Sequence, residues 1–306
     1  MNLDKAHPEL QKRLRRIPTI PVHHAPVRWL ISKLANLMPG FKGDDEIEVE
    51  WIEHSHSQSK VYQPRNVQSD MALLWIHGGG YLFGHANQDD KLVQSVIKRL
   101  GITVVSVHYR MAPAHPFPAA LDDCATSWQW LRANAADLGV DPHKILIGGQ
   151  SAGGGLTASL AQRLLDEGGV QPMAQLLFCP MLDDRTVLRT ELTEDNHFIW
   201  NNKSNHTGWQ CYLGQEPGLP NAPEHAVPAR RESLAGLPPA WIGVGSIDLF
   251  ADEDIAYAER LRADGVDCEL YVCEGGPHAY ESFFPDTNVA KAHWESVFAF
   301  IERFSS

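Results

Sequence analysis

The most constraining feature of this sequence is a serial alternation between short apolar runs of strand length and segments of helix length. The run at residues 73–76 is apolar on both faces, as expected of a strand buried inside a sheet. Strands that alternate with helices along a chain pair in parallel, and the helices cover the sheet. The sequence therefore predicts an α/β fold with a mostly parallel central sheet flanked by helices. The expected strands are residues 47–52, 73–76, 102–107, 144–147, 174–178, 241–245 and 268–272, and the expected helices are residues 89–100, 118–134, 152–165, 252–263 and 288–304.

Two segments fall outside this alternation and predict additions to the core. Residues 1–45 contain two helical segments, and the second, residues 26–38, has large apolar side chains at helical spacing. Residues 183–239 begin as a polar stretch with scattered aromatic residues and then become rich in proline. We expect residues 46–182 and 240–306 to form the core. The N-terminal arm and the first part of the insertion are expected to contribute a cap over a site.

Charge and hydropathy exclude several partner classes. The 306 residues include 26 Lys plus Arg and 38 Asp plus Glu, which gives a formal net charge of −12. The average field therefore repels phosphate backbones and anionic lipid surfaces, so we expect no nucleic-acid partner. No stretch of about 18 consecutive apolar residues occurs, so we expect no insertion into a membrane.

The cysteine pattern bears on compartment and on metals. An odd number of cysteines without a C-x-x-C pair argues against a disulfide framework and against a Cys-rich zinc site. The N-terminus also lacks the apolar run of a secretory signal, and we expect a cytoplasmic protein. The five cysteines are Cys124, Cys179, Cys211, Cys268 and Cys273.

A G-x-S-x-G motif at residues 149–153 lies between an expected strand and an expected helix. Such a turn exposes a nucleophilic hydroxyl, here that of Ser151, when glycines flank it on both sides. The following helix directs free N–H groups toward negative charge that develops beside the serine. The alternative reading of the motif is a glycine-rich turn that binds a phosphate or a cofactor.

The stretch His77-Gly78-Gly79-Gly80 follows the strand at residues 73–76. Consecutive glycines leave backbone N–H groups accessible, as the stabilisation of an oxyanion requires. We expect Gly79, Gly80 and Ala152 to donate to the oxyanion, with Gly78 shaping the loop. The alternative is a flexible turn without a chemical role.

These motifs resemble those of the hormone-sensitive-lipase-like (bacterial type IV) carboxylesterases, a branch of the α/β-hydrolases. The resemblance covers roughly residues 45–305 and implies the α/β-hydrolase fold with a helical cap. It also implies a metal-free serine carboxylesterase for short- to medium-chain acyl esters that uses no cofactor. The resemblance rests on residues 77–80, 109–120, 149–154, 248–253 and 276–279.

The other two members of a catalytic triad follow in the chain order nucleophile, acid, histidine that this fold uses. Asp248 follows an expected strand, so its carboxylate should emerge at the same edge of the sheet as Ser151. His278 lies in a loop after the next strand, from which it can reach both residues. The competing acids at 252–254 fall in the first turn of a helix, where they complement its dipole.

Four positions depart from the usual pattern of the family and put the usual charges around the triad in doubt. Gln150 and Ala114 stand where acidic residues are common, His108 where Asp is common and Leu249 where Pro is common.

Aromatic residues are candidates for substrate contacts, although sequence does not separate pocket walls from the core of a cap. The candidates are Tyr81, Phe198, Trp200 and Trp209. His54 and His56 share a face at strand spacing, but without a third ligand they do not predict a metal site.

The sequence thus predicts a serine carboxylesterase whose partner is a small-molecule ester. A lactonase or an amidase could use the same triad, and a non-catalytic ligand-binding protein on this fold is a further alternative. A homodimer that pairs through the final strand is also a hypothesis.

Overall fold

The computed structural model describes residues 3–18, 20–193 and 197–304. Its centre is one eight-stranded sheet in the order β1-β2-β4-β3-β5-β6-β7-β8. β2 runs antiparallel to β1 and β4, and every other neighbouring pair is parallel. The predicted α/β class with a mostly parallel sheet is confirmed. The strands are β1 (Ile47–Glu53), β2 (Gln58–Pro64), β3 (Ala72–Ile76), β4 (Thr103–His108), β5 (Ile145–Gln150), β6 (Gln175–Phe178), β7 (Ala240–Gly245) and β8 (Cys268–Cys273).

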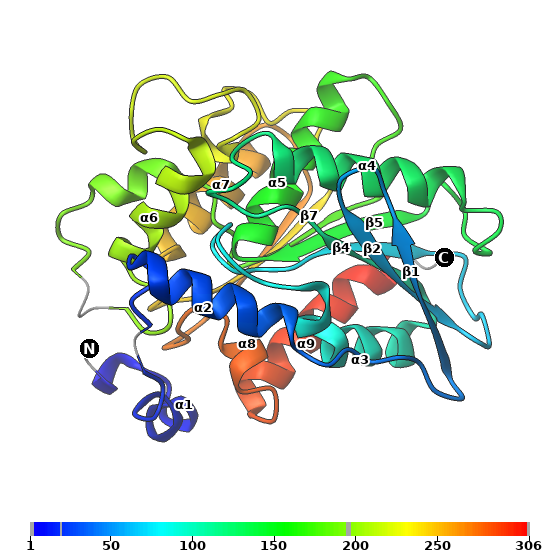
Figure 1. Cartoon of the computed structure of the whole chain (residues 1–306), viewed down its shortest axis with the longest axis horizontal. Helices are drawn as coiled ribbons and strands as arrows, with labels where there is room; N and C mark the ends of the chain where they lie inside the picture. The colour runs from blue at the N-terminus through cyan, green and yellow to red at the C-terminus, as the bar shows by residue number, and fades with distance from the viewer. Residues whose placement is uncertain (1–2, 19, 194–196, 305–306) are drawn as a thin grey trace.

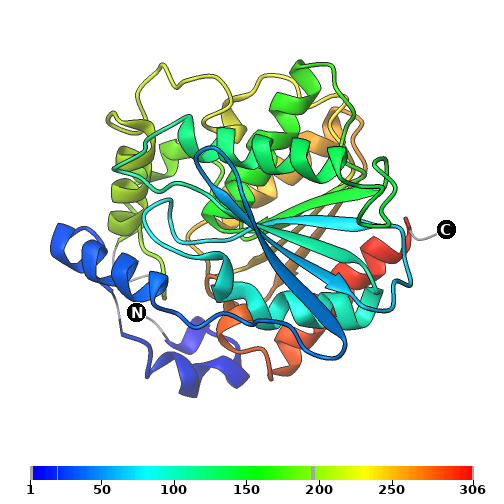
Figure 2. The same cartoon turned by 45° about the vertical axis from the view of Figure 1, so that its right-hand side comes forward.

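Helices cover both faces of the sheet (Figure 1 and Figure 2). The largest core cluster joins the sheet to α4, α5 and α7, and a second cluster joins its opposite face to α3 and α9. The helices are α1 (Pro8–Leu14), α2 (Ala25–Asn36), α3 (Asp90–Leu100), α4 (Ala119–Ala133), α5 (Ala152–Asp166), α6 (Asn202–Leu213), α7 (Ala251–Ala263), α8 (Tyr280–Phe283) and α9 (Asn288–Glu302). None of the helices in the described parts of the chain has both the length and the apolar character needed to cross a bilayer.

Strand β2 is an element that the sequence pattern does not predict. One of its residues, Lys60, is fully buried, which a hydrophobic pattern cannot anticipate. The Lys60 ammonium donates to the carboxylate of Asp90 at 2.7 Å and to the side chain of Asn87 at 2.8 Å. Burial of the charge is tolerated because it is paired and hydrogen-bonded.

The start of the N-terminal arm is tied to the core. Leu10 and Leu14 of α1 are buried in a cluster with Phe284 and Tyr280. The backbone N–H of His7 donates to the carbonyl of Gly275 at 2.9 Å. The arm therefore packs beside the segment that follows β8.

Candidate active site

Ser151 lies in a sharp turn between β5 and α5. Its φ of 57° is a conformation that residues other than glycine rarely adopt, and such strain costs about 1–3 kcal/mol. Two hydrogen bonds hold the turn, from the Ser151 N–H to the Phe178 carbonyl and from the Met181 N–H to the Ser151 carbonyl. A Cβ on Gly153 would lie 2.1 Å from the carbonyl oxygen of Ile76, so helix α5 can approach β3 only with glycine there.

His278 connects the serine to a carboxylate. Its Nε2 lies 2.9 Å from Ser151 Oγ, and its Nδ1 lies 2.9 Å from Asp248 Oδ2. The three residues follow β5, β7 and β8, so the carboxyl ends of three parallel strands bring them together. All three are buried, with relative exposures of 4–6 %. The remaining Asp248 oxygen, Oδ1, accepts the N–H of Phe250 at 3.0 Å.

The competing acids lie elsewhere in the described structure. Asp252 forms a surface ion pair with Arg189. The Glu253 carboxylate accepts the N–H groups of Leu182 and Asp183, and burial raises the pKa of Glu253 to about 8. Burial also raises the pKa of Asp254, whose carboxyl oxygens have no hydrogen-bond partner among the described residues.

The glycine loop after β3 lies against the nucleophile. A Cβ on Gly78 would lie 3.4 Å from Ser151 Cβ, and Gly79 has a φ of 128°. Ala152 is the first residue of α5, where backbone N–H groups have no partner within the helix. Gly78 of the loop and the start of α5 therefore both lie beside Ser151.

His77 braces this loop. Its ring stacks on Tyr109 with centroids 4.4 Å apart, and its Nδ1 lies 2.8 Å from the Gly78 carbonyl. The Tyr109 hydroxyl donates to the His77 carbonyl at 3.0 Å. Complete burial lowers the pKa of His77 to about 3, so its imidazole is neutral and serves as a hydrogen-bonding support.

Residues 73–282 match the model of a protein family described by the α/β-hydrolase fold. The chain belongs to this family. The predicted α/β-hydrolase fold is thereby confirmed, and the relatives below bear out the resemblance to hormone-sensitive-lipase-like carboxylesterases.

Relatives of this hydrolase carry esterase names. The esterase LipI of Mycobacterium tuberculosis is 31% identical over 92% of this chain and 84% of its own length. The carboxylesterase NlhH of the same species is 34% identical over 73% of this chain and 71% of its own. A solved structure of a bacterial heroin esterase has a TM-score of 0.92 at 31% identity and covers 100% of both chains. The predicted class of carboxylic ester hydrolase agrees with these names.

Gly79→Ala is expected to lower the kcat of this hydrolase by about 10²–10³-fold, the effect of removing one oxyanion donor. The added Cβ would lie 1.8 Å from the Phe83 carbonyl oxygen, so the loop must shift. Steady-state hydrolysis of p-nitrophenyl butyrate measures the change. Gly265→Ala is the matched control, because Gly265 also has a positive φ but no atom within 4 Å of its added Cβ. Equal kcat values for the two variants would contradict a role for the loop.

The four aromatic candidates occupy different environments. A Cβ on Gly80 would lie 2.2 Å from the indole ring of Trp200, so Trp200 packs on the glycine loop. Tyr81 and Trp209 are fully buried and contact each other, with ring centroids 5.4 Å apart. Phe198 lies in the cluster formed with α1. Of the four, the structure places Trp200 directly beside the predicted oxyanion loop.

Beside the triad, Gln150 and Glu281 form a hydrogen bond that the sequence does not predict. The amide of Gln150 donates to Glu281 Oε1 and to Ser282 Oγ, both at 2.6 Å. Glu281 is 2% exposed, and burial raises its pKa to about 7. The hydrogen bonds that its carboxylate accepts lower the pKa, but by less than burial raises it. The departure from the family pattern at Gln150 marks this position in the sequence. Its partner, Glu281, could not be found in the same way because it lies 131 residues further along the chain.

Glu281→Gln is expected to stabilise the hydrolase in mild alkali. The Glu281 carboxyl is ionised above pH 4.5 in the unfolded chain but only above about pH 7 in the folded protein. Wild-type stability therefore falls as pH rises through this window. At pH values above this window, the neutral variant should be more stable by roughly 3–3.5 kcal/mol, and below pH 4.5 the difference should vanish. Urea unfolding at pH 4.5 and 8.5 measures it; a difference independent of pH would contradict the assignment.

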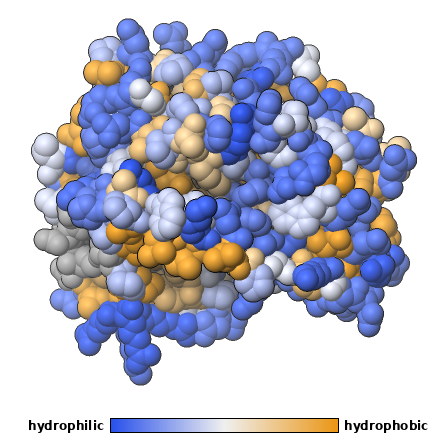
Figure 3. All heavy atoms as spheres, viewed as in Figure 1, coloured by the Kyte–Doolittle hydropathy of each residue, from blue (hydrophilic) through white to orange (hydrophobic). Residues whose placement is uncertain are grey.

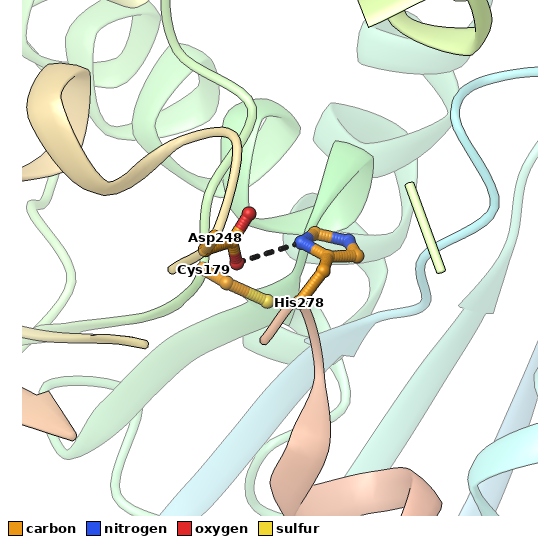
Figure 4. A group of neighbouring side chains, drawn as sticks. All are labelled: Cys179, Asp248 and His278. Carbon is orange, nitrogen blue, oxygen red and sulfur yellow. Dashed lines mark hydrogen bonds and ion pairs between the residues drawn. The ribbon is translucent and has the colours of Figure 1, made fainter. Parts of the chain in front are cut away.

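Cys179 lies beside the acid and the histidine of the triad (Figure 4). Its Sγ and ligand atoms of Asp248 and His278 lie within 4.8 Å of one another. Burial raises the pKa of Cys179 well above its ordinary value, so the thiol stays protonated and is a poor metal ligand. Both nitrogens of His278 are engaged by Ser151 and Asp248. The arrangement therefore favours a hydrogen-bonded triad over a metal centre.

Proposed function

We propose that this carboxylic ester hydrolase acts on short- to medium-chain acyl esters through an acyl-enzyme intermediate on Ser151. The observation that carries the proposal is the single imidazole of His278, within 2.9 Å of both the Ser151 hydroxyl and the Asp248 carboxylate. The esterase names of the relatives support the type of bond, and the family resemblance supports the chain length.

Acylation begins when His278 Nε2 takes the Ser151 proton and Oγ attacks the ester carbonyl carbon. The carbonyl oxygen gains the negative charge, and the N–H groups of Gly79, Gly80 and Ala152 are proposed to stabilise it. Collapse of the tetrahedral intermediate breaks the bond to the alcohol oxygen, which takes the proton from His278. The acyl group is left on Ser151.

Deacylation repeats these steps with water. His278 takes a proton from water as its oxygen attacks the acyl carbon, and it returns a proton to Ser151 Oγ as the acid leaves. Asp248 accepts a hydrogen bond from Nδ1–H, which fixes the tautomer of His278 and stabilises the imidazolium. No cofactor takes part in this sequence.

The surroundings of the triad are proposed to select the acyl group. Trp200 packs on the glycine loop and is the proposed wall of the acyl site, with Tyr81, Phe198 and Trp209 supporting the wall or the cap. Residues 1–45 and the first part of 183–239 are proposed to form that cap. We further propose a cytoplasmic location, in which the five free cysteines stay reduced.

The proposal is tested with pure protein on p-nitrophenyl esters from acetate to decanoate, and on lactone and anilide panels. We expect kcat/KM to peak among the shorter esters and a phosphonate probe to label Ser151 by mass spectrometry. If only the lactones or only the anilides are turned over, the enzyme would be a lactonase or an amidase instead of an esterase for acyl esters. Absence of both turnover and labelling would leave a ligand-binding role.

A further inference from the structure

Helix α2 exposes its large apolar side chains instead of burying them. None of its residues is buried. The exposed fractions are 63% for Trp29, 51% for Leu30, 58% for Leu34 and, just beyond the helix, 77% for Leu37. Figure 3 shows a hydrophobic band across the face of the molecule on which α2 lies in Figure 1. Patches of this kind mark interaction surfaces.

The helix is amphipathic with its apolar side turned outward. Leu30, Leu34 and Leu37 recur at intervals of four and three residues, so they share one face. The guanidinium of Arg28 donates to the carbonyls of Val22 and His23, each at 2.9 Å, which ties α2 to the turn before it. Ile31 packs against the main core cluster, and the exposed apolar face of α2 remains for a partner.

The charge of the arm is opposite to that of the rest of the protein. Residues 1–45 contain eight of the 26 Lys and Arg and four acidic residues, whereas residues 46–306 contain 18 basic and 34 acidic residues. Helices α1 and α2 lie on the same side of the molecule (Figure 1 and Figure 2). Exposed cations of the arm that form no salt bridge within the described residues are Lys5, Lys12, Arg15, Arg16, Lys33 and Lys42.

The arm presents these groups from a fixed position. Arg13 of α1 pairs with Asp286, and the buried Leu10 and Leu14 hold the helix on the core. After α2, the backbone N–H of Phe41 donates to Asp90 at 2.5 Å. Both ends of the arm are thus fixed to the core.

We propose that this surface, which consists of α2 and the exposed cations of the arm, adsorbs to an anionic lipid bilayer. Helices that lie in the plane of a membrane interface combine Trp and Leu on one face with Lys and Arg beside it. The acidic remainder opposes adsorption weakly, because screening limits its field to about 8 Å at physiological salt. The net charge of −12 belongs to the whole chain and does not describe this surface.

A second copy of the chain is a poorer occupant of this surface. In a two-fold dimer the same patch meets itself. Two arms, each with an excess of four positive charges, would then face one another. Lipid phosphates complement these charges, whereas a second arm repels them.

Co-sedimentation with vesicles tests the proposal. We expect binding to vesicles of equal parts phosphatidylglycerol and phosphatidylcholine, at least about tenfold weaker binding in 0.5 M NaCl, and little binding to phosphatidylcholine alone. The Leu34→Ser/Leu37→Ser variant should lose at least about tenfold in binding. Leu219→Ser, which changes an exposed leucine of the insertion, is the control and should bind as wild type does.

Circular dichroism melting confirms that each variant is folded, and light scattering reports the oligomeric state. Absence of wild-type binding to the anionic vesicles would overturn the proposal. Equal binding by the double variant and the control would overturn it as well. A wild-type dimer that becomes monomeric in the double variant, without vesicle binding, would assign the surface to a second copy. None of these results depends on esterase activity.

Discussion

Ser151→Ala is expected to lower the hydrolysis of p-nitrophenyl butyrate by about 10⁵–10⁶-fold while the protein stays folded. Without Oγ no acyl-enzyme can form, and only the oxyanion donors and substrate binding remain to catalyse attack by water. The change also removes one hydrogen bond, to His278, in a buried site. Initial rates with and without the phosphonate probe, at equal protein concentration, measure the loss.

Ser159→Ala is the matched control for this variant. Ser159 is buried on the same helix, α5, two turns beyond Ser151. We expect it to keep wild-type kcat and to show that loss of a buried hydroxyl does not by itself stop turnover. A Ser151→Ala protein that retains a few per cent of wild-type activity would contradict the acyl-enzyme mechanism.

Asp248→Asn is expected to lower kcat by about 10⁴-fold. An asparagine amide can turn its NH₂ group toward His278 Nδ1, which then becomes the acceptor and leaves the proton on Nε2. That nitrogen can no longer take the Ser151 proton. The amide also cannot stabilise an imidazolium as the carboxylate at 2.9 Å does. A profile of kcat against pH measures the loss, and recovery at high pH would reflect hydroxide acting in place of the base.

Asp252→Asn tests whether the acid role belongs to position 248. Asp252 is exposed and pairs with Arg189 on the surface, so its neutral variant should keep kcat within about twofold. A small effect of Asp248→Asn combined with a large effect of Asp252→Asn would move the acid role to the neighbouring helix.

The order of strands and helices could be predicted because alternating apolar runs report how each segment is buried. The pattern fails where burial depends on a distant partner. β2 is missed because Lys60 reads as a solvent-exposed residue until Asp90 is known to lie beside it. Helix α6 is missed because Asn202, His206 and Gln210 give the segment a polar character.

The site likewise combines features that the sequence predicts with features that it does not. Ser151, Asp248 and His278 could be placed at one edge of the sheet because each follows a strand, and the structure brings their side chains together. The partner of Gln150 could not be predicted, because no local pattern links it to Glu281. For α2, helical spacing predicts an apolar face but does not say whether that face turns toward the core or the solvent.

The hydrogen bond from the His7 N–H to the Gly275 carbonyl joins the N-terminal arm to the loop that carries His278. Gly275 precedes His278 by three residues, and a Cβ on Gly275 would lie 2.3 Å from the His7 nitrogen, so the contact is tight. A tag or a deletion at the beginning of the chain is therefore expected to shift the loop at Gly275 and, with it, the imidazole of His278. For anyone who engineers this enzyme, the first α-helix belongs to the catalytic unit even though it contributes no reacting group.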